Sequence, residues 1–135
     1  MNKYDEIRYL LQKYSTKQPS ERWSTRSETQ YKRLMRLKEK TELFDGINTE
    51  YFHLRGSQRE RCVYLIKHLN FNDVCRRCSN EQIIVLICYF VKCEYVKGYG
   101  RKYCRRVFKE YNIEDTLIDR FMVYLANIGV NGGFS

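Results

Sequence analysis

The stretch EQIIVLICYFVKCEYV, residues 81–96, decides the fold of this chain. It is apolar on nearly every side of a helix until Lys92, and Ser79 forms a capping box with Gln82 at its start. A helix that is apolar all round has to be buried, with other helices packed around it. The sequence therefore predicts an all-α fold, a compact helical domain with a central hydrophobic helix.

Charged and irregular segments precede this domain. Apolar residues at helical spacing predict a short helix over residues 4–14. Thr25 and Glu28 form a capping box that predicts a strongly charged helix over about residues 26–42. Residues 43–56 combine turn residues and aromatic anchors without a clear period, which predicts a linker or an irregular segment wrapped on the core.

A regular pattern begins at residue 57. Ser57 and Glu60 form another capping box, and the apolar stripe that follows predicts an amphipathic helix ending near residues 70–73. We therefore divide the chain into a charged N-terminal helical extension, residues 1–46, and a helical core domain, residues 47–135.

Two helices are expected after the central one. The stretch GYGRKYCRRVFKEYNI, residues 98–113, predicts a helix whose cations share one face, and residues 117–128 predict the last helix. Between them, Asn112 occupies a position where a left-handed residue often turns the chain, and Ile113 is placed to plug the turn. The pair is predicted to resemble a helix-turn-helix motif, although an ordinary helical hairpin has the same pattern.

Positive charge is concentrated near this pair. The chain carries 25 Lys and Arg against 16 Asp and Glu, a net charge of +9, and the excess is mostly spread along the sequence. One segment holds six cations and no acid, namely Lys97, Arg101, Lys102, Arg105, Arg106 and Lys109. On an exposed helix such a density binds phosphates, so we predict a nucleic-acid contact there. The alternative is a solvated helix face whose charges bind nothing specific.

The last helix is a poor candidate for reading bases. Its leading residues include Glu114, Asp115 and Asp119, whose carboxylates repel phosphates. The cations lie on the first helix of the pair, which contacts the DNA backbone more often than the bases. We therefore expect contact with phosphates rather than recognition of a base sequence.

Helix order and apolar rhythm suggest a family. Residues 81–129 resemble the last three helices of a cyclin-like repeat of the archaeal transcription factor B and eukaryotic TFIIB family. Upstream, residues 31–41 and 57–69 have patterns of charged and apolar residues similar to those of that family's basic linker and the opening helix of its first repeat. The resemblance implies contacts with promoter DNA and the transcription machinery, with the basic positions as phosphate contacts. The segment between His68 and Ser79 is too short for the full second helix of such a repeat.

Six cysteines raise the question of a metal site. Cys75 and Cys78 have the two-residue gap with which a thiolate pair binds zinc, but a structural site needs two more ligands. Cys62 and His68, on the helix upstream, are the nearest candidates for a mixed site. Because this spacing matches no zinc motif, we expect no cofactor, and we expect buried cysteines to act as small core residues.

The sequence gives little support for catalysis or membrane insertion. There are two histidines, no glycine-rich phosphate loop and no nucleophile elbow, and the CRRC pair follows no βαβ pattern, so we predict a protein that is not an enzyme. The longest apolar run, residues 83–91, is shorter than the roughly 20 residues that cross a bilayer. The N-terminus lacks the order of regions of a signal peptide. We expect an intracellular protein in the cytoplasm, or in the nucleus or host cell interior for a eukaryotic or viral source.

Two functions of different class fit these observations. The first is DNA binding in transcription regulation, through a basic helix face on the phosphate backbone. The second is a protein-interaction adaptor or homodimer, in which the charged helix and the aromatic residues Phe44, Tyr51 and Phe52 dock a partner. The first requires the five cations of residues 101–109 to be exposed and coplanar, and a buried ion-pair network around Arg105 and Arg106 would exclude it. The second requires an exposed apolar patch in the N-terminal half.

Overall fold

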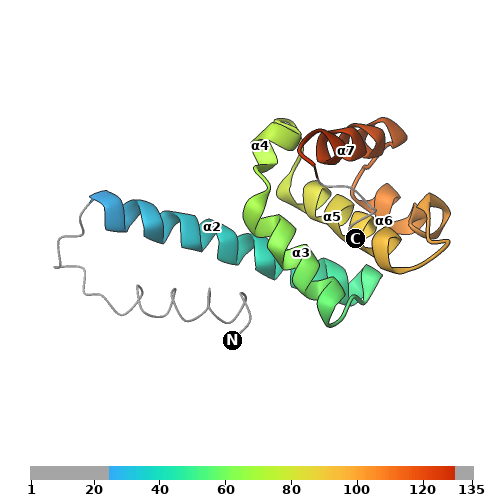
Figure 1. The fold of residues 1–135 in the computed structure, drawn as a ribbon, viewed down its shortest axis with the longest axis horizontal. Coiled ribbons are helices and arrows are strands. Elements are labelled where there is room, and N and C mark those ends of the chain that lie inside the picture. The colour runs from blue at the N-terminus through green and yellow to red at the C-terminus, as the bar shows by residue number, and fades with distance from the viewer. Residues whose placement is uncertain (1–24, 130–135) are drawn as a thin grey trace.

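The computed structural model describes residues 25–129, with side chains from residue 29 onward. The described residues form helices and turns and contain no strand, so the predicted all-α class is confirmed (Figure 1). In chain order the elements are α2 (Thr25–Ile47), the π-helix η1 (Asn48–Phe52), α3 (Ser57–His68), α4 (Phe71–Val74), α5 (Asn80–Tyr95), the 3-10 turn η2 (Arg101–Tyr103), α6 (Arg105–Glu110) and α7 (Asp115–Asn127). The helix predicted over residues 4–14 lies outside the described residues. None of the helices in the described part has the length and apolar content needed to cross a membrane.

Helix α5 forms the centre of the domain, as predicted. Every residue from Ile83 to Val91 is buried. Helices α2, α3 and α4 pack against it, and the buried residues of α6 and α7 belong to the same core (Figure 1). Burying one large apolar side chain contributes about 1.5–3 kcal/mol, and α5 buries more such side chains than any other described helix. It is therefore the main source of hydrophobic stabilisation.

The predicted capping box at the start of α5 is confirmed. The Gln82 N–H donates to Ser79 Oγ at 3.2 Å, and Gln82 Oε1 accepts from the Ser79 N–H at 3.0 Å. The remaining amide group of Gln82 donates to the Tyr111 carbonyl at 2.9 Å. One side chain thus caps α5 and holds the turn between α6 and α7.

Helix α2 is longer than predicted. It continues to Ile47, and η1 follows directly, so the linker or irregular segment predicted over residues 43–56 is wrong as far as residue 52. The reason is burial, because Phe44 and Ile47 lie one helical turn apart and both enter the core. The predicted domain boundary after residue 46 falls inside this helix. Figure 1 shows the N-terminal half of α2 extending away from the other described helices, whereas its C-terminal end joins them.

A buried asparagine closes the loop after η1. Asn48 Oδ1 accepts from the Leu54 N–H at 2.7 Å, and Asn48 Nδ2 donates to the Leu54 carbonyl at 3.0 Å. Lys92 Nζ of α5 donates to the Phe52 carbonyl at 2.9 Å. Backbone groups that would otherwise be buried without partners are satisfied in this way.

The capping box predicted from Ser57 and Glu60 does not form. Ser57 is the first residue of α3, so its side chain does not precede the helix, and the residue before it, Gly56, makes no side-chain cap. Gly56 has φ 59°, a left-handed conformation that favours glycine. The third predicted box, at Thr25 and Glu28, lies outside the described side chains.

We expect Gln82→Glu to destabilise the domain more than Ser79→Ala. The glutamate keeps an acceptor for the Ser79 N–H but places a carboxylate against the Tyr111 carbonyl, which should cost about 1–3 kcal/mol in the free energy of unfolding. Ser79→Ala removes only the cap and should cost about 1 kcal/mol. Urea unfolding followed by circular dichroism measures both. Equal stability of Gln82→Glu and wild type would show that the bond to Tyr111 contributes nothing.

Candidate nucleic-acid interface

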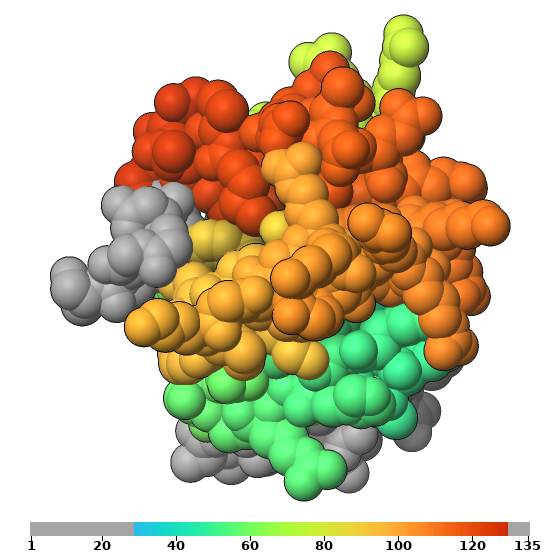
Figure 2. Space-filling view, turned by 90° about the vertical axis from the view of Figure 1, so that its right-hand side faces the viewer, coloured from blue at the N-terminus to red at the C-terminus, as the bar shows by residue number. Residues whose placement is uncertain are grey.

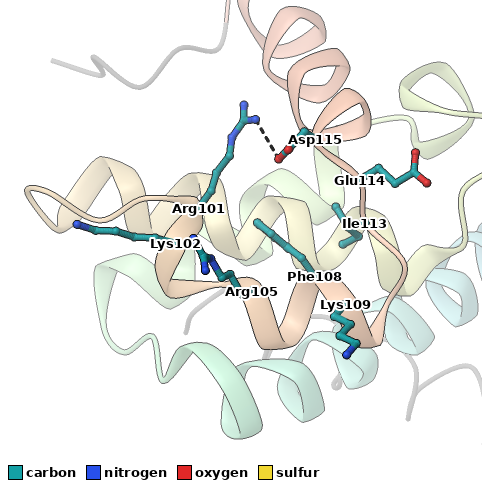
Figure 3. A pocket seen from close by; sticks show the side chains of 8 residues that line it. All are labelled: Arg101, Lys102, Arg105, Phe108, Lys109, Ile113, Glu114 and Asp115. Carbon is teal, nitrogen blue, oxygen red and sulfur yellow. Dashed lines mark hydrogen bonds and ion pairs between the residues drawn. The ribbon is translucent and has the colours of Figure 1, made fainter.

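An open groove of about 660 Å³ runs along η2, α6 and the first turn of α7. Its lining residues, which define the basic groove, are Arg101, Lys102, Arg105, Phe108, Lys109, Ile113, Glu114 and Asp115 (Figure 3). Phe108 and Ile113 are buried and belong to the hydrophobic core, so they hold the base of the groove in place. The other side chains are charged and surround this apolar base.

The helix predicted over residues 98–113 is interrupted, so its cations do not share one helical face. The coplanar arrangement that the DNA-binding hypothesis requires is therefore not found. The 3-10 turn η2 and the six-residue helix α6 meet at Cys104, which is buried. The Tyr99 hydroxyl lies 2.9 Å from Cys104 Sγ, and the Tyr99 ring stacks on Tyr103 with 5.5 Å between centroids. These contacts fix the interruption. Figure 3 shows Lys102 and Lys109 pointing in different directions from the groove.

The six predicted contact residues nevertheless remain largely accessible. Arg101 is partly buried, whereas the other five are exposed: Lys97, Lys102, Arg105, Arg106 and Lys109. Four of the six line the basic groove, and Lys97 and Arg106 do not. No buried ion-pair network surrounds Arg105 and Arg106 among the described residues, so the arrangement that would exclude phosphate binding is not found there.

Arg101 is already neutralised by α7. Its guanidinium pairs with Asp115 Oδ1 at 3.3 Å and with Asp119 Oδ1 at a shorter distance (Figure 3 shows the Asp115 pair). The hydrogen bond to Asp119 is the largest cause of a pKa of Arg101 above its ordinary value. Sequence analysis missed this role, although Asp115 and Asp119 are four residues apart and therefore share one helix face.

Arg106 lies on the other side of α6 with weak partners. Its Nη2 is 4.0 Å from Glu50 Oε1, and its guanidinium lies over the Tyr51 ring at 5.4 Å. The Tyr51 hydroxyl donates to Glu110, and this bond raises the pKa of Tyr51 above its ordinary value. The Arg106 side chain is 80% exposed, and an exposed ion pair is worth at most about 1 kcal/mol, so a phosphate could replace Glu50.

Three cations of the basic groove are free to bind a ligand. Within the described part of the chain, Lys102, Arg105 and Lys109 have no hydrogen-bond or ion-pair partner. Lys102 Nζ lies 5.1 Å from the centre of the Tyr103 ring, a contact that leaves its charge exposed. Their charges are therefore uncompensated, in contrast to that of Arg101.

The turn of the predicted helix-turn-helix-like pair is confirmed. Asn112 has φ 55°, and the buried Ile113 donates its N–H to the Phe108 carbonyl at 2.8 Å. The apolar face of α7, formed by Ile118, Phe121 and Leu125, is buried. The exposed start of α7 is acidic, as the sequence indicates, and offers carboxylates rather than base-reading donors.

The docking residues of the adaptor hypothesis are mostly inaccessible. Phe44 is 0% exposed and Phe52 is 1% exposed, because both belong to the core, and Tyr51 is half-buried. Among the described residues of the N-terminal half, the large apolar side chain that is exposed is Tyr64, on α3, which is not one of the predicted docking residues. The predicted aromatic docking surface is therefore wrong.

The candidate zinc ligands do not come together. Cys62 is buried against Cys88, and Cys75 lies beside Cys78. The His68 ring contacts the Tyr64 ring in a tilted arrangement, with 4.2 Å between centroids. In the described ranges no three His, Cys, Asp or Glu side chains lie close enough to hold a metal ion. The mixed site from Cys62, His68, Cys75 and Cys78 is not assembled because Cys62 points into the core.

Comparison with known proteins gives no relative: no protein-family model, curated protein or solved structure matches this chain. The resemblance to a cyclin-like repeat therefore stays a prediction. In the segment between His68 and Ser79, the structure has only the single-turn helix α4. The function has to be argued from the geometry of the basic groove.

Proposed function

We propose that this protein binds DNA through the basic groove and acts in transcription regulation. The observation that carries the proposal is the set of three exposed cations without protein partners, Lys102, Arg105 and Lys109, around the apolar base at Phe108. Exposed Lys and Arg side chains without protein partners bind phosphates, and this binding releases the counterions condensed on the nucleic acid. The net charge of +9 adds long-range attraction to a polyanion.

The geometry favours contact with the backbone over recognition of bases. The free cations come from η2 and α6, and α6 is the first helix of the helix-turn-helix-like pair. In DNA-binding motifs of this kind the first helix crosses the backbone, whereas the second enters the major groove. Here the second helix begins with Asp115 and Asp119, which repel phosphates. Binding is therefore electrostatic and only weakly dependent on sequence.

The link to transcription rests on the form of the C-terminal pair. Helix-turn-helix pairs are a common architecture of transcriptional repressors and activators. The sequence resemblance to the cyclin-like repeat of general transcription factors points in the same direction. A protein that contacts only the DNA backbone would act in transcription by occupying the DNA or by placing a partner protein on it.

We expect wild-type affinity for a random-sequence duplex to fall steeply between about 50 and 200 mM salt, with a log–log slope of about −3 for three phosphate contacts. The triple variant Lys102→Ala, Arg105→Ala, Lys109→Ala should lose both affinity and slope. Fluorescence anisotropy across the salt series measures both.

The matched control for this series is Arg33→Ala, Arg55→Ala, Lys67→Ala. It removes the same charge from exposed positions outside the basic groove and should keep most of the affinity. If the two triple variants weaken binding equally, attraction is a property of net charge and the groove is not the site. If wild type does not bind, the proposal is wrong.

The acids of α7 supply a second test. Replacing Asp115 and Asp119 by Asn releases Arg101 and removes two repulsive charges, so affinity at low salt should rise about tenfold and the slope should steepen by about one. The control Glu39→Gln, Glu60→Gln removes two exposed acids elsewhere. An equal gain in both variants would show that Arg101 does not become a phosphate contact.

A further inference from the structure

Two cysteines lie side by side at the surface, away from the basic groove. Cys75 ends α4, and Cys78 lies just before the capping residue of α5. Both are free thiols and partly exposed. Atoms of the segment between α3 and α5, yellow-green in Figure 2, protrude beyond the neighbouring surface. Because both thiols are partly exposed, a small reactant can reach them.

The surroundings of the two thiols are asymmetric. The neighbouring Cys78 thiol is the largest cause that lowers the pKa of Cys75, and the backbone of Arg77 and Cys78 acts in the same direction. The nearby charge of Arg120 on α7 also lowers the pKa of Cys75. Burial and the neighbouring Cys75 thiol raise the pKa of Cys78 to about 12. Cys75 is thus the better thiolate of the two.

We propose that Cys75 and Cys78 form a redox-active dithiol that reacts with low-molecular-weight disulfides of the glutathione class. Cys75 is the attacking thiol and Cys78 is the resolving thiol. The proposal rests on the two-residue gap between the cysteines in the short turn that joins α4 to α5, and on the partial exposure of both free thiols. It is independent of DNA binding.

The reaction takes two exchange steps. The Cys75 thiolate attacks one sulfur of the disulfide, so a mixed disulfide forms on Cys75 and the first small thiolate leaves and takes a proton from water. Cys78 then loses its proton to water and attacks Cys75 Sγ, which closes the Cys75–Cys78 disulfide and releases the second small thiolate. The protein dithiol gives up two electrons and two protons, and the small disulfide becomes two thiols.

The other cysteines do not offer this chemistry. Cys62, Cys88 and Cys104 are buried, and burial raises the pKa of Cys88 and Cys104. Cys93 is half-buried, its thiol lies 3.6 Å from the Tyr99 carbonyl, and burial raises its pKa as well. Reaction should therefore be selective for the exposed pair, because thiolate character and access control the rate.

The test is to incubate the reduced full-length chain in glutathione buffers of rising oxidised fraction, quench with acid, alkylate the free thiols and map peptides by mass spectrometry. Wild type should give the Cys75–Cys78 disulfide. Cys78→Ser should stop at a glutathione adduct on Cys75, and Cys75→Ser should react at least about tenfold more slowly. Cys93→Ser is the matched control and should behave as wild type.

The wild-type arm decides the proposal without any variant. If both thiols stay free across the buffers, or if glutathione adducts on Cys75 persist in the presence of Cys78, the proposal is overturned. Equal rates for the two single variants would overturn the assignment of Cys75 as the attacking thiol. Circular dichroism of each variant establishes that these comparisons are made between folded proteins.

Discussion

The structure depends on one constraint, the need to keep water away from every side of α5. A helix with a continuous buried run from Ile83 to Val91 is stable only if helices cover it all round. The end of α2 enters the core because Phe44 and Ile47 complete that cover. The same demand brings Phe108 of α6 against Tyr89 of α5, with 5.3 Å between ring centroids. The fold is the arrangement of helices that buries α5 on every side.

The position of the basic groove follows from this packing. Cys104, Phe108 and Ile113 anchor α6 and its turn in the core. Arg105 and Lys109, which lie between these anchors in the sequence, face solvent. Gln82 fixes the turn to the start of α5, and the ion pairs of Arg101 fix η2 to α7. The segments that carry the free cations are therefore held at both ends by rigid contacts. The backbone of such a surface loses little conformational entropy when the surface binds an anion, and the cost is confined to the cationic side chains.

The sequence predicts the fold class, the central helix, its capping box and the turn at Asn112, because each depends on local pattern or on the periodicity of apolar residues. It fails where tertiary contacts override that pattern. The break at Cys104 comes from contacts with Tyr99 and Tyr103, and the extension of α2 comes from the burial of Phe44. The cations were identifiable by their density alone. The pairing of Arg101 was not, because it joins residues of separate elements.

The order of elements along the chain has a consequence for biosynthesis. A ribosome produces α5 before α6 and α7, so the apolar run is made before Phe108, Phe121 and Leu125, which belong to the same core. The core cannot close until Leu125 has left the ribosome. During that interval the nascent chain exposes an apolar helix. Such exposed apolar surface binds chaperones and makes the chain prone to aggregate at high expression. Slow translation through the C-terminal pair would prolong this exposure.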